Sequence, residues 1–116
     1  MRKVLLDTSF ILTAVRQKLD FFHDFEMLGL QVLIPKNVIR ELEGLSKKDE
    51  AKLALLIISK HKFSKIETRG KTVDSSIINF AKENPEIAIA TLDKEIKNKT
   101  KNQKIVIKQK KLLEFV

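Results

Sequence analysis

The hydrophobic residues of this chain fall into short uninterrupted runs that alternate with longer stretches of helical periodicity. The uninterrupted runs cover residues 4–6, 31–34, 87–90 and 105–107, and a weaker one covers 65–67. Runs of this kind are typical of strands covered on both faces in a parallel sheet. Parallel strands must be joined by crossovers, which are usually helices. The pattern therefore predicts an α/β fold: a three-layer α/β/α sandwich with a central parallel sheet of about five strands.

Helices are expected between these runs, where apolar residues recur at helical spacing. They cover residues 10–16, 19–28, 36–45, 47–61, 73–83 and 94–98, and residues 111–115 are expected to form a short closing helix or an extended tail. Gly29 stands in the position of a helix stop, and Ser46 is placed to cap the helix over 47–61. That helix is expected to turn four residues inward: Leu53, Leu56, Ile57 and Ile58.

The chain has 116 residues and no repeat or linker, which predicts a single domain over residues 1–116. It has no cysteine, which excludes disulfides and thiolate metal sites. No apolar run approaches the roughly 18 residues of a membrane span. Asp7 also interrupts the N-terminal apolar stretch, unlike a secretory signal. A cytoplasmic protein without membrane contact is therefore expected.

The net charge is +8, from 23 Lys and Arg against 15 Asp and Glu. This excess indicates an anionic partner, and nucleic acid is the first candidate. A lysine-rich solvated surface would give the same excess. Charge therefore indicates a class of partner without identifying one.

Several acidic residues stand where strands end or helices begin. Asp7 follows the run at 4–6, and Asp93 follows the run at 87–90. Asp74 lies in the first turn of the helix over 73–83, while Glu41 and Glu43 lie on opposite flanks of the apolar stripe of the helix over 36–45. Periodicity cannot choose between these two glutamates. Each acid could simply favour a helix start, but in a parallel sheet four of them can converge at the carboxyl edge, where ligands bind.

Four converging carboxylates would repel one another and would need protons or cations. Oxygen ligands without cysteine or paired histidines suit Mg²⁺ or Mn²⁺. Such an ion lowers the pKa of bound water and neutralises charge on a phosphodiester. A basic surface with an acidic metal pocket is the charge pattern of a nuclease.

Four motifs in order resemble those of PIN-domain ribonucleases, and the resemblance covers essentially the whole chain. They are Leu6-Asp7-Thr8-Ser9-Phe10, Val38-Ile39-Arg40-Glu41-Leu42, Val73-Asp74-Ser75-Ser76-Ile77 and Ala90-Thr91-Leu92-Asp93. The resemblance implies a metal-dependent endoribonuclease with a catalytic and metal-binding quartet of Asp7, Glu41, Asp74 and Asp93. It thereby favours Glu41 over Glu43. It implies supporting roles near the metal for Ser9, which would help to hold Asp7 or a metal-bound water, and for Thr8. Glu95, two residues beyond Asp93, is either an outer acid of the site or a solvated glutamate at a helix start.

Two branches of the family fit. The stretch 19–22 is similar to the Fcf-type branch, which implies processing of ribosomal RNA and a ribosomal assembly factor as partner. The compact length is similar to VapC-type toxins, which implies an antitoxin. Asp74-Ser75 departs from the Fcf-type pattern, which often has two adjacent aspartates here. A PIN-like module that binds RNA or a ribosomal particle without catalysis is the remaining alternative.

Binding of RNA is expected to depend on phosphate contacts, since the chain has no Trp or Tyr for a base-stacking platform. Residues 94–111 contain eight lysines and one acid. The residues expected to contact RNA are Arg40, Arg69, Lys71, Lys94, Lys97, Lys99 and Lys101. Three phenylalanines between residues 19 and 28 predict either core packing or an exposed patch, and the family resemblance implies a homodimer.

Overall fold

The computed structural model describes the backbone of residues 2–115 and the side chains of residues 2–112. Its strands are β1 (Arg2–Leu6), β2 (Leu30–Pro35), β3 (Ser64–Ile66), β4 (Ala88–Ala90), β5 (Lys104–Lys108) and β6 (Lys111–Phe115). Its helices are α1 (Thr8–Arg16), α2 (Phe21–Met27), α3 (Lys36–Gly44), α4 (Asp49–Ser59), α5 (Val73–Glu83) and α6 (Lys94–Lys99). Apart from residues 111–115, the expected elements are all present, with small shifts at their ends.

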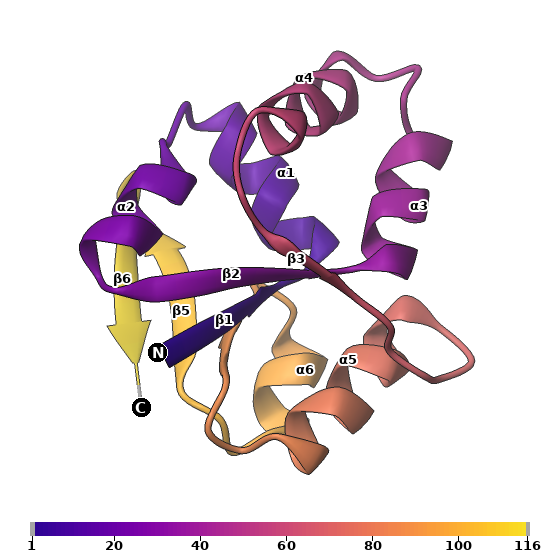
Figure 1. The fold of residues 1–116 in the computed structure, drawn as a ribbon, viewed down its shortest axis with the longest axis vertical. Coiled ribbons are helices and arrows are strands. Elements are labelled where there is room, and N and C mark those ends of the chain that lie inside the picture. The colour runs from indigo at the N-terminus through magenta and orange to yellow at the C-terminus, as the bar shows by residue number, and fades with distance from the viewer. Residues whose placement is uncertain (1, 116) are drawn as a thin grey trace.

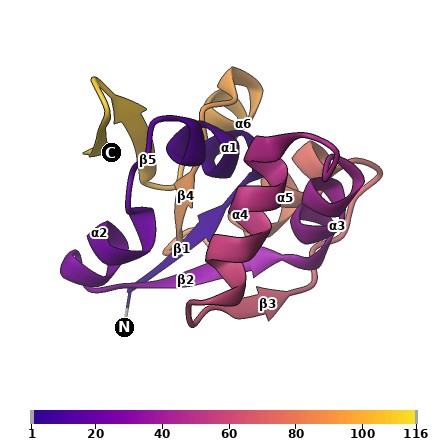
Figure 2. The same ribbon diagram turned by 90° about the horizontal axis from the view of Figure 1, so that it is seen from above.

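The strands form one sheet in the order β3-β2-β1-β4-β5-β6. The first five are parallel, and β6 is antiparallel to β5. Helices α1, α3 and α4 gather on one side of the sheet, and α5 and α6 pack together on the other (Figures 1 and 2). The predicted three-layer sandwich is therefore confirmed.

The sheet has one strand more than expected because residues 111–115 form β6. Gln109 and Lys110 both take left-handed backbone conformations, with φ of 51° and 61°. A two-residue hairpin turn of the primed type requires such angles, and it returns the chain beside the strand it has just left. The closing segment is accordingly an antiparallel edge strand, not a helix.

The phenylalanines of α2 belong to the core. Phe21, Phe22 and Phe25 are buried, so these rings follow the core-packing alternative of the prediction. Phe10 of α1 contacts two of them: its ring stacks on Phe25 at a centroid distance of 5.8 Å and meets the edge of Phe21 at 6.2 Å, while Phe22 packs on Phe21 at 4.9 Å. Aromatic rings favour these arrangements. The sequence could not show that α1 would supply this partner.

Helix α4 faces the core with only two of its four expected residues, Ile57 and Ile58. Ala51, Ala54 and Ile58 are buried, whereas Leu53 and Leu56 are 46% and 51% exposed. The small alanines allow α4 to pack closely against α1 and α3. The predicted cap was also wrong, since α4 begins after Lys48 and uses no side-chain cap. No helix among the described residues is long and apolar enough to cross a membrane.

Candidate active site

Asp7 lies where β1 ends and is the N-cap of α1. Its Oδ1 accepts hydrogen bonds from the Phe10 amide (2.9 Å) and from the Ser9 hydroxyl (2.8 Å), and its Oδ2 accepts one from the Thr91 hydroxyl. The side chain is buried, and burial raises the pKa of Asp7 above its ordinary value although these hydrogen bonds oppose the rise. The carboxylate is thus held in one orientation at the carboxyl edge of the sheet.

Two hydroxyl groups join the ends of β1 and β4. Besides donating to Asp7, Thr91 Oγ1 accepts the Asp93 amide at 3.1 Å, and Ser9 Oγ accepts the Leu92 amide at 3.4 Å. The chain leaves β1 toward β2 on one side and reaches β4 on the other, so these bonds span the point where strand order reverses. Ligands bind at this point in open α/β sheets.

Thr91 was not among the residues expected to serve the site. It is fully buried, and its hydroxyl is the link between Asp7 and Asp93. The available signal was a polar residue placed directly after a buried strand and two positions before an acid. Only the pairing of β1 with β4 showed which carboxylate it would meet.

Asp93 is half-buried and is the N-cap of α6. Its Oδ1 accepts the amides of Glu95 (2.8 Å) and Ile96 (3.1 Å). Among the described residues, Oδ1 is the acceptor of both hydrogen bonds that the Asp93 carboxylate receives. Oδ2 is therefore available to a cation.

The charges of several other acids act on the carboxyl group of Asp74. It lies in the first turn of α5, whose N-cap Thr72 forms a capping box with Ser75. Partial burial raises the pKa of Asp74, and three nearby carboxylates raise it further, those of Asp93, Glu41 and Glu95. Asp74 in turn contributes to the raised pKa of Asp7. The fold thus brings the four predicted acids, with Glu95, into one electrostatic neighbourhood.

Helix α3 turns Glu41, rather than Glu43, toward this neighbourhood. Asn37 donates a hydrogen bond of 2.8 Å to Ser76 of α5, which fixes the face of α3 that meets α5. Glu41 is one helical turn beyond Asn37 and so lies on the same face. It is also the glutamate of α3 whose charge acts on Asp74.

The donor chemistry of the site fits a hard divalent cation. All the acids offer oxygen, and among the described residues neither Asp7 nor Asp74 forms an ion pair. The buried hydroxyl of Thr8, beside Asp7, has no hydrogen-bond partner among the described residues, and a hydrated cation would supply one. As they stand, no three acids in the described part are close enough to form a ligand set.

The lysines after Asp93 are not all placed alike. Lys94 and Lys101 are exposed, Lys97 is half-buried, and Lys99 pairs with Glu95 at 2.8 Å. Lys104 is buried and donates to the carbonyls of Thr100 and Asn102, so it cannot contact RNA.

Arg40 and Lys71 line a cavity beside the acids, and Arg69 lies in the same loop as Lys71.

Comparison with known proteins gives a consistent set of matches. Residues 4–111 match the family model described as a PIN like domain. Ribonuclease VapC4 of Methanocaldococcus jannaschii is 32% identical over 127 aligned positions, which cover 99% of this chain and 97% of that protein. The PIN domain endonuclease Utp24 has a similar structure, with a TM-score of 0.81 at 24% identity over 95% of this chain and 88% of that one. VapBC2 from Rickettsia felis, solved with a DNA fragment from its promoter, matches with a TM-score of 0.55 at 13% identity over 88% of this chain and 98% of that one.

Proposed function

Because this chain belongs to the family of PIN-like domains, we propose that it is a metal-dependent endoribonuclease. The observation that carries the proposal is the convergence of acids at the carboxyl edge of the sheet. Asp7 and Asp93 lie just beyond the carboxyl ends of the neighbouring strands β1 and β4. The negative charges of Asp93 and Glu41 contribute to the raised pKa of Asp74. A full-length relative that is a ribonuclease supports the same activity.

Asp7 and Asp93 would be the principal ligands of Mg²⁺ or Mn²⁺, with Glu41 and Asp74 completing the site. A bound ion would supply an activated water and would neutralise charge on the phosphodiester. Ser9 and Thr91 hold the Asp7 carboxylate by hydrogen bonds, so its oxygens need no reorientation. Glu41 and Asp74 approach from facing helices and would close the site from the other side.

RNA is the proposed substrate, and an antitoxin of the VapB type is the proposed protein partner. The full-length similarity to VapC4 favours the toxin branch. Processing of ribosomal RNA is the second candidate, and the high TM-score with Utp24 motivates it, although at 24% identity that match shows the fold alone. Homodimerisation stays a prediction, now without the phenylalanine patch that suggested it.

Cleavage of short single-stranded RNAs tests the proposal, with Mg²⁺, with Mn²⁺ and with chelator. Asp7→Asn and Asp93→Asn should each reduce cleavage by more than the roughly 10- to 100-fold that is typical when only a group behind a metal ligand is lost. Both variants should fold, because Asn caps a helix as well as Asp does. Glu43→Gln is the matched control and should cleave like wild type.

Cleavage that is equally fast in chelator, or in both Asn variants, would refute the proposed chemistry. RNA binding without any cleavage would instead favour the non-catalytic module. Growth arrest on expression in cells, relieved by a protein encoded beside this chain, would separate a toxin from a processing enzyme.

A further inference from the structure

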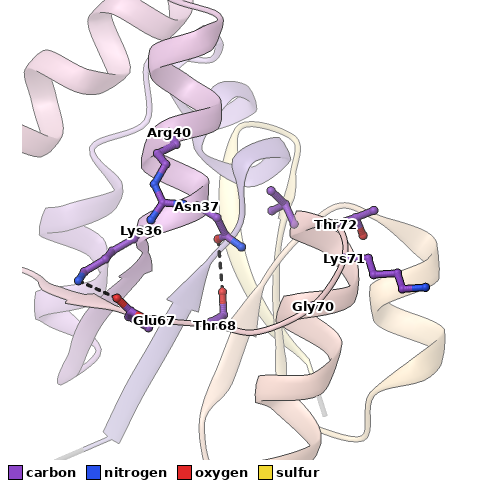
Figure 3. A pocket seen from close by; sticks show the side chains of 9 residues that line it. Lys36, Asn37, Arg40, Glu67, Thr68, Gly70, Lys71 and Thr72 are labelled. Atoms are coloured by element: carbon purple, nitrogen blue, oxygen red, sulfur yellow. Dashed lines mark hydrogen bonds and ion pairs between the residues drawn. The ribbon is translucent and has the colours of Figure 1, made fainter.

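A cavity of about 280 Å³ lies between the start of α3 and the loop that precedes α5. Figure 3 shows its side chains: Lys36, Asn37 and Arg40 come from α3, and the others come from residues 67–73. Its position relative to the acids follows from the chain, since Arg40 precedes Glu41 and Val73 precedes Asp74. The cavity is therefore next to the proposed catalytic site.

The charges of three cations act on one carboxylate at this cavity, that of Glu67. Lys36 Nζ lies 3.0 Å from Glu67 Oε1, and the pair is drawn in Figure 3. Lys36 lowers the pKa of Glu67 most, and the charges of Arg40 and Arg69 lower it further. Lys36 and Arg40 are one helical turn apart on α3, so their charges lie on one face. The Glu67 carboxylate thus occupies a position beside these cations that an anionic ligand could take.

A hydrogen-bonded group keeps the two walls of this cavity in place. Thr68 Oγ1 donates to Asn37 Oδ1 at 3.3 Å and lies 3.1 Å from Ser76 Oγ, and Asn37 donates to the same Ser76 oxygen. Since Ser76 is fully buried in α5, the group ties α3, α5 and the loop together. The pocket is therefore formed before any ligand arrives.

We infer that this pocket binds a backbone phosphate of the RNA beside the one that is cleaved, and that Glu67 is an internal competitor for it. The inference rests on the proposed action on RNA. The Lys36 and Glu67 side chains are 43% and 70% exposed, and exposed ion pairs of this kind are weak. A phosphate, with more charge and more acceptor oxygens, can displace the carboxylate and take over Lys36 and Arg40.

The test is a salt titration of the binding of labelled single-stranded RNA, made in chelator with the Asp7→Asn protein as background. Glu67→Gln removes the competitor, so binding should tighten by roughly two- to fivefold. The slope of log affinity against log salt should change little, because the same phosphate contact forms with and without Glu67. Lys36→Ala should weaken binding and reduce the slope by about 0.7.

Two matched controls separate the pocket from a general effect of charge. Glu50→Gln also removes a carboxylate from an exposed ion pair, that of Arg16 and Glu50, on α4. Lys62→Ala removes an exposed lysine next to the amino end of β3. If Glu67→Gln binds like Glu50→Gln, or Lys36→Ala like Lys62→Ala, the inference is wrong.

The cleavage assay keeps this inference separate from the proposed function. Cleavage with no response to the pocket variants would overturn the inference alone. A response of binding without metal-dependent cleavage would support the pocket and overturn the nuclease proposal. Absence of RNA binding in every protein would overturn both.

Discussion

Replacing Thr91 by valine removes a single oxygen from the centre of the site. The side chain is fully buried and valine has nearly the same shape, so packing should be preserved while two hydrogen bonds are lost. One is donated to the charged Asp7 carboxylate and the other is accepted from the Asp93 amide. A hydrogen bond to a charged group contributes about 1.5–3 kcal/mol and a neutral one about 1 kcal/mol. Thr91→Val should therefore lower the free energy of unfolding by about 3 kcal/mol at neutral pH.

The sign of the pH dependence provides a second, independent readout. Thr91 is the strongest of the groups that lower the pKa of Asp7, so its removal should raise that pKa further. A carboxyl group whose pKa is raised by folding destabilises the native state above that pKa, and protonation relieves the cost. The difference between variant and wild type should therefore shrink as the pH falls through the folded pKa toward the ordinary value of 3.8.

The measurement is urea unfolding of metal-free protein, analysed for midpoint and slope. A loss of this size should also lower Tm by about 10 °C in a domain of this length. Thr100→Val is the matched control: that threonine is buried too, but its hydroxyl donates only to the Ile96 carbonyl, so the cost should be about 1 kcal/mol. The reasoning fails if Thr91→Val is no less stable than Thr100→Val, or if the difference from wild type does not shrink in acid.

Two further predictions concern the loop before α5 and the repulsion among the acids. A Cβ added at Gly70 would lie 2.6 Å from the Ser76 amide nitrogen, so Gly70→Ala should lower the free energy of unfolding by about 1–3 kcal/mol and slow cleavage by moving the start of α5. A Cβ added at Gly44 meets nothing within 4 Å, so Gly44→Ala should not destabilise the fold. Equal stability of the two variants in urea would contradict this prediction. Partial burial and then neighbouring charges raise the pKa of Asp74, so in chelator Asp74→Asn should be more stable than wild type at neutral pH, and this advantage should fade as the pH drops toward 3.8. Added Mg²⁺ should stabilise wild type more than this variant, and thermal melts at several pH values that show neither trend would count against an acidic metal site.

The order of strands and helices could be predicted from the sequence because it depends on local periodicity. Short apolar runs such as Val4 to Leu6 are typical of strands buried on both faces, and the helical spacing between them predicts crossover helices as the connections. The candidate acids Asp7 and Asp93 could be found for the same reason, since Asp7 follows such a run directly and Asp93 follows one after two residues. Their shared edge then follows from parallel pairing, which the β1–β4 register bears out.

Features that depend on a partner distant in the chain could not be predicted in this way. Residues 53–58 are almost continuously apolar, so periodicity could not show that α4 would turn its alanines toward α1 and α3. In the same way, burial of Phe25 on α2 depended on contact with the ring of Phe10. The closing segment is a strand because it pairs with the edge of β5.

The detailed arrangement of the site was likewise decided by tertiary structure. Glu41 and Glu43 are equivalent in the sequence pattern, and only the hydrogen bond from Asn37 to α5 decides which of them approaches Asp74. Thr91 meets Asp7 because β1 and β4, more than eighty residues apart in the chain, are neighbours in the sheet. The sequence by itself determined which chemical groups stand at the ends of strands, because that depends on neighbouring residues. Only the tertiary structure decided which of those groups meet, because contact depends on how separate elements pack.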